Sequence, residues 1–144
     1  MKRIALLPLV TLLAACAAAT STPLASPAPG EINFTIAVGE NPGGSFTISL
    51  GVENHGAAAI PANRFRSAWL LTSTSGEARA SGEGLLPQIE PDGGRVQNVV
   101  VWEGVIEPGG YALQWGAPAL GSSSAHFEIV AGENGPRLGT LTID

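Results

Sequence analysis

The chain has 144 residues, of which 13% are charged, and its formal net charge at pH 7 is −5. A net negative charge disfavours binding to nucleic acid and to anionic lipid headgroups, because both are themselves negatively charged. The chain contains 19 Gly, 11 Pro and a single Cys. This composition is typical of short strands joined by many turns, and one cysteine excludes a framework of disulfides within the chain.

The first residues have the layout of a secretory signal. A basic start, Lys2-Arg3, precedes a short apolar run, and small residues stand just before Cys16. The sequence therefore predicts a signal peptide at residues 1–15. A transmembrane anchor is disfavoured, because the apolar stretch 4–19 is interrupted by Pro8 and is shorter than the roughly 20 apolar residues that a spanning helix needs.

The end of this segment, Leu13-Ala14-Ala15-Cys16, resembles the lipobox of bacterial lipoproteins. In that family a signal peptidase cuts before the cysteine, its sulfur receives a diacylglycerol, and its new amino group is acylated with a chain such as palmitate. The resemblance implies lipidation of Cys16 and a location on the periplasmic or extracellular face of a membrane. Ala17 in place of an aspartate favours the outer membrane where one is present. An ordinary signal peptide cut within 14–19 is the alternative.

A linker and one folded domain are expected after the cysteine. Residues 16–30 contain three prolines among small side chains, which predicts a flexible, extended linker. From residue 31 onward apolar and polar side chains alternate with a period of two, as in half-buried antiparallel strands. The expected strands are 32–38, 46–53, 65–73, 95–102, 110–115, 124–131 and 138–143, with a short one at 78–81. Seven or eight strands separated by turns predict an immunoglobulin-like antiparallel β-sandwich over residues 31–144.

One stretch of this domain resembles a known group of bacterial immunoglobulin-like domains. Val101-Trp102-Glu103-Gly104, followed by Pro108-Gly109-Gly110-Tyr111-Ala112-Leu113, is similar to a W-x-G…P-G-x-Y-x-L pattern. BsuPI-like domains, named after an intracellular proteinase inhibitor, carry this pattern. They also have an early strand that ends in Asn, compared here with Asn54, and a Pro-Gly turn, compared with the turn at Pro91. The resemblance implies binding to a protein, and a proteinase-inhibitor-like activity.

No pattern in the sequence is typical of a catalytic or metal site. His55 falls in a predicted turn, and His126 falls on the polar side of a predicted strand. The serines at 122–124 lie close to His126 in sequence, but they are not part of the G-x-S-x-G turn of serine hydrolases. We therefore predict no catalytic residue, no metal ligand and no cofactor.

The sequence as a whole predicts a lipid-anchored, non-catalytic protein-interaction module of the cell envelope. The alternative is a carbohydrate or cell-wall binding module that uses exposed tryptophans at Trp69, Trp102 and Trp115, although core packing is the favoured role for these rings. The loop 57–66 ends in two cations, so it is either a contact for an acidic partner or a plain connection between sheets. The identity of the partner and the oligomeric state stay open.

Overall fold

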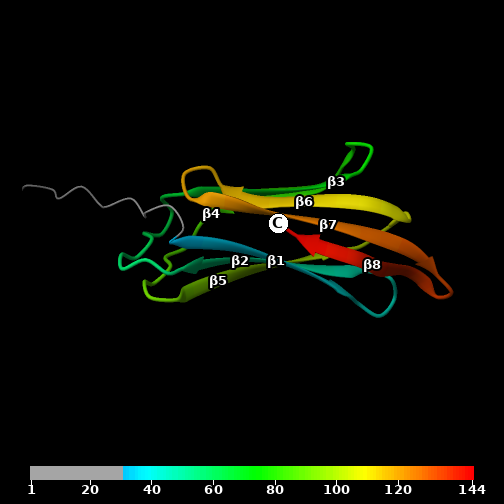
Figure 1. Ribbon diagram of the computed structural model, residues 1–144, viewed down its shortest axis with the longest axis horizontal. Helices are drawn as coiled ribbons and strands as arrows, with labels where there is room; N and C mark the ends of the chain where they lie inside the picture. Colours follow the sequence, from blue (N-terminus) through cyan, green and yellow to red (C-terminus); the bar gives the residue numbers. More distant parts are fainter. Residues whose placement is uncertain (1–30) are drawn as a thin grey trace, which may run out of the picture.

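The computed structural model describes residues 31–144, and they form two antiparallel β-sheets packed face to face (Figure 1). The predicted signal peptide, the predicted lipidation site at Cys16 and the predicted linker lie outside the described residues. The strands are β1 (Ile32–Glu40), β2 (Phe46–Asn54), β3 (Arg66–Ser73), β4 (Ala78–Leu85), β5 (Gly94–Trp102), β6 (Gly109–Ala117), β7 (Gly121–Gly132) and β8 (Gly135–Ile143). The predicted all-β sandwich is confirmed.

The strand order is that of an immunoglobulin-like sandwich with one strand moved and one added. One sheet has the order β1-β2-β5, and the other has the order β4-β3-β6-β7-β8. In constant-type immunoglobulin domains a fourth strand continues the first sheet beyond the strand that corresponds to β5. Here β4 pairs with β3 instead, so β5 is the edge of its sheet, while β8 extends the second sheet beyond β7.

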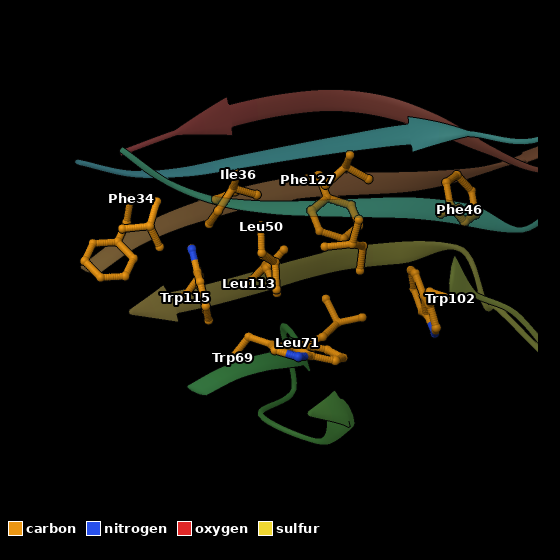
Figure 2. Packing of buried hydrophobic residues seen from close by; sticks show 14 of the residues in the cluster. Phe34, Ile36, Phe46, Leu50, Trp69, Leu71, Trp102, Leu113, Trp115 and Phe127 are labelled. Atoms are coloured by element: carbon orange, nitrogen blue, oxygen red, sulfur yellow. The ribbon is translucent and has the colours of Figure 1, made fainter. Parts of the chain in front are cut away.

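Aromatic rings join the two sheets in the core (Figure 2). Trp102 on β5 lies 5.8 Å from the ring of Phe46 on β2 and 5.0 Å from the ring of Tyr111 on β6, measured between ring centroids. Trp115 packs edge-on against Phe34 and donates a hydrogen bond of 3.0 Å from Nε1 to the Gly51 carbonyl in the opposite sheet. No disulfide spans the described domain, since the single cysteine of the chain is Cys16, so packing of this kind holds the sheets together.

Tyr111 forms a tyrosine corner at the start of β6. Its hydroxyl donates a hydrogen bond of 2.6 Å to the Glu107 carbonyl four residues earlier, across the turn that carries the chain from β5 to β6. This corner is a hallmark of immunoglobulin-like sandwiches, where it fixes the connection between the sheets. Burial is the main cause that raises the pKa of the Tyr111 phenol above its ordinary value of 10.0.

Tyr111→Phe should lower the free energy of unfolding by about 1 kcal/mol near pH 7, because the Glu107 carbonyl loses its donor. A second effect appears in alkali. The raised pKa gives a stabilisation that is present below about pH 10 and is lost as pH rises from there through the folded-state value, because the unfolded phenol ionises first. Urea unfolding between pH 7 and 11 should therefore show a steeper alkaline loss for the native chain than for Tyr111→Phe. Parallel curves for the two proteins contradict the prediction.

Two loops close the end of the sandwich at which β1 begins (Figure 1). The loop between β2 and β3 pairs with the loop between β4 and β5 through Ile60 and Ile89, whose amides and carbonyls form two hydrogen bonds of 2.9 and 3.0 Å. The Leu86 amide also donates a hydrogen bond of 2.9 Å to the Phe65 carbonyl. The loop 57–66 is therefore a connection between the sheets, as one of the two interpretations expected. Its Arg66 pairs with Glu83 on β4 at 3.0 Å.

Candidate functional site

The sandwich is open along one side, between edge strands β4 and β5. On the opposite side β1 packs across β7 and β8. Along the open side lie two cavities, of about 380 and 360 Å³. The larger cavity lies between Trp69 of the five-stranded sheet and the β5 residues Val96, Gln97 and Asn98. The smaller one lies beside Arg79 and Ala80 of β4 and the end of β5 at Trp102.

Small residues on β4 leave room for these cavities. Ala80 and Gly82 occupy inward-facing, half-buried positions where the other strands carry large apolar side chains. Glycine is needed at position 82, because a Cβ atom there would collide with Nε1 of Trp69. This indole N–H forms no hydrogen bond with any part of the chain that the structure describes, and the ring lines the larger cavity. The open side therefore offers a hydrogen-bond donor beside an apolar wall.

Strand β5 presents an exposed apolar edge along this open side. The outward-facing Val99 and Val101 are 56% and 54% exposed, and Val105 in the loop that follows is 93% exposed. No charged residue occurs from Val96 to Trp102, and the run is bounded by Arg95 and Glu103. Native proteins usually protect an edge strand with charges, prolines, bulges or a covering segment. Within residues 31–144, β5 has none of these from Val96 to Trp102.

The other edge strands are protected. β4 carries Arg79 and Glu83, and its pairing with β3 is interrupted by an irregularity. β8 carries Pro136 and Arg137, and its pairing with β7 is also irregular. β1 packs against β7 and β8, and Glu40 at its end binds Arg137 at 2.7 Å. The β5 edge is thus the candidate functional site of the described domain.

The tryptophans singled out in the sequence are core residues. Trp69, Trp102 and Trp115 are only 9%, 8% and 5% exposed. Each stands at an inward-facing position of its strand, so its ring faces the opposite sheet. The expected contribution to the core is confirmed. The exposed ring faces on which the carbohydrate-binding alternative depends are not present, because the sheet pairing turns all three side chains inward.

The two histidines lie on the surface. Within residues 31–144 neither of them is part of a catalytic triad. His55 lies 3.2 Å from Glu53, and His126 lies 3.6 Å from the carboxylate of Asp144. Ser123 donates its hydroxyl to the Asp144 backbone carbonyl at 3.2 Å, and no serine hydroxyl of the described chain binds His126. Ser123 and Asp144 border a wide, shallow hollow of about 620 Å³ over the outer face of the five-stranded sheet, and neither histidine lines it.

The described chain has neither a cluster of metal-ligating side chains nor a membrane-spanning helix. Between residues 31 and 144 no group of three His, Cys, Asp or Glu side chains is placed to hold a metal ion. The same residues contain no helix long and apolar enough to cross a membrane.

The fold and the edge strand define the class of protein: residues 31–144 form an immunoglobulin-like β-sandwich in which the β5 sheet edge is unprotected. No protein-family model matches the chain, and no curated protein is significantly similar to it in sequence. The candidate site therefore depends on the geometry described above. No sequence motif marks Val99, Val101 and Val105 as binding residues. The signal that could have found them is the uncharged run from Val96 to Trp102, where three consecutive valines interrupt the alternation of apolar and polar residues.

Proposed function

We propose that this protein is a non-catalytic protein-interaction module of the cell envelope, anchored by lipid at Cys16 and binding through its β5 edge. The observation that carries the proposal is the exposed apolar surface of Val99 and Val101 on an edge strand and of Val105 in the loop after it. An exposed edge offers a row of backbone donors and acceptors, and an added strand from a protein partner satisfies them. The adjacent cavities supply room for alternate side chains of such a strand.

Photo-crosslinking in cells tests the binding surface. A benzophenone amino acid at Val101 should give covalent adducts with protein, whereas the same residue at Val130 should give none. Val130 is the matched control, since it is a partly exposed valine on the outer face of a strand in the other sheet. Adducts at neither position, or equal adducts at both, contradict the proposed binding surface.

The anchor is tested by Cys16→Ser, which removes the thiol that receives the lipid. One acyl chain gives only marginal membrane binding, at about 0.8 kcal/mol per buried methylene, while several chains together hold a protein essentially permanently. We expect the native chain to sediment with membranes and to resist extraction by salt or carbonate. The Cys16→Ser protein should lose this association, and the native mature N-terminus should show the mass of the lipid. A native protein without lipid mass overturns the proposed anchor.

A further inference from the structure

We propose that the β5 edge pairs antiparallel with the β5 edge of a second copy, with a two-fold axis at Val99, so that two three-stranded sheets join into one sheet of six strands. The inference rests on the proposed protein-binding role of this edge and names the partner. Three observations carry it: the regular free edge, the register of side chains around Val99, and the charges at the two ends of the strand.

The backbone of β5 is suited to accept another strand. Its pairing with β2 runs without a register shift from Gly94 opposite Asn54 to Trp102 opposite Phe46. A strand this regular presents an evenly spaced row of amides and carbonyls along its other side. No bulge and no proline disturbs that row, and no charged side chain occurs on it between Val96 and Trp102.

The side chains of β5 are compatible with those of a second β5. Around a two-fold axis at Val99 this valine stands opposite its own copy, and Val101 stands opposite Gln97 of the second molecule. All of these side chains are exposed on the outer face of the three-stranded sheet. Directly opposed and diagonal side-chain pairs stabilise neighbouring strands, and here Val99 meets its own copy directly and Val101 of the second molecule diagonally. Pairing therefore covers valine side chains that are more than half exposed in the single domain.

The charges at the ends of the strand specify this register. With the axis at Val99, Arg95 of each copy stands opposite Glu103 of the other. The Arg95 side chain is 76% exposed and in its own chain is paired with Glu53 at 3.2 Å. Glu103 is exposed and has no ion pair within the described residues. An axis moved by one residue to Asn98 would instead set Arg95 opposite Val101, so only the Val99 register makes both opposite-charge pairs.

This complementarity favours a second copy over an unrelated strand. One strand carries a basic residue at one end, Arg95, and an acidic residue just beyond the other, Glu103, with valines between them. A two-fold axis at the centre therefore sets opposite charges against each other at both ends. Self-complementary contacts of this kind close into a dimer rather than a fibre. The pairing also brings the open sides of the two sandwiches face to face, so the cavities beside Trp69 and Trp102 become shielded from solvent.

Cysteine cross-linking tests the register. In the full-length chain carrying Cys16→Ser and purified in detergent, Val99→Cys should be joined to its own copy by a short bis-maleimide. Val130→Cys, on the outer face of the other sheet, should react with a monofunctional maleimide but form no cross-linked dimer. Absence of a dimer for Val99→Cys at micromolar concentration, or equal dimer yields for the two variants, overturns the proposal.

Charge reversal supplies a second readout that also reports on folding. Glu103→Arg should weaken dimerisation roughly tenfold, because two attractive pairs become two repulsive ones. Arg95→Glu should do the same, and the double variant should recover most of the affinity measured by sedimentation equilibrium. Circular dichroism should be unchanged in Glu103→Arg, because this carboxylate has no ion pair in its own chain. A double variant no tighter than either single variant overturns the register.

The photo-crosslinked adducts at Val101 separate this inference from the proposed function. Adducts of twice the mass of the chain support pairing with a second copy. Adducts that contain a different protein, together with a monomer in sedimentation, overturn self-pairing and leave the protein-binding role of the edge standing. No adduct at all overturns both.

Discussion

Replacing Trp102 with alanine is expected to lower the free energy of unfolding by about 3–5 kcal/mol. Trp102 contacts rings from both sheets: Phe46 beside it, and Tyr111 and Phe127 across the core at centroid distances of 5.0 and 6.4 Å. Truncation therefore removes buried apolar area and two edge-to-face contacts, and it leaves a cavity that the two sheets cannot close without moving together. The midpoint of urea unfolding, followed by far-ultraviolet circular dichroism, measures the loss.

Val105→Ala is the matched control for this prediction. Val105 lies three residues later in the chain and is 93% exposed, so its truncation should change stability by no more than about 0.5 kcal/mol. Comparable losses for the two variants would show that Trp102 contributes little to holding the sheets together. A loss confined to Trp102→Ala supports packing as the substitute for the missing disulfide.

Most of the fold could be predicted because the alternation of side chains is a local property. Ile32, Phe34 and Ile36 on β1 all face the core, as their spacing indicates. β4 was predicted too short, at 78–81, whereas it runs to Leu85. Its alanines and glycines do not form an alternating apolar and polar pattern that would mark a strand. Instead, its length is set by pairing with β3, which extends as far as Arg66 opposite Leu85. Tertiary pairing, rather than the strand's own sequence, decides that boundary.

The candidate site could not be predicted in the same way, because an edge is a property of topology. The run from Val96 to Trp102 is equally compatible with a buried central strand, which also lacks charges. Only the placement of β4 beside β3, and not beside β5, makes β5 an edge strand. The tryptophans illustrate the same limit. The sequence around a core tryptophan does not differ from that around an exposed one, and only the position of the opposite sheet decides between the two roles.

Asn54 at the end of β2 provides the second large effect, because it is a fully buried polar side chain that holds two loops. Its Nδ2 donates to the Ala58 carbonyl at 2.9 Å and to the Ile89 carbonyl of the other loop at 3.4 Å, and its Oδ1 accepts the Gly56 amide at 3.0 Å. Asn54→Ala should lower the free energy of unfolding by about 2–4 kcal/mol, since a buried donor and a buried acceptor lose their partners. Chemical denaturation measures this loss.

The effect of Asn54→Ala should also have a local signature. The amides of Gly56 and Ile60 should exchange with deuterium faster than in the native chain, because the turn that begins at Asn54 positions the loop against Ile89. Asn33→Ala removes the same side chain from an exposed position on β1 and should leave both stability and exchange nearly unchanged. Equal exchange rates in the native and Asn54→Ala proteins would mean that backbone contacts alone hold this end of the sandwich closed. Faster exchange confined to these loops would instead show that the buried side-chain amide of Asn54 holds them closed.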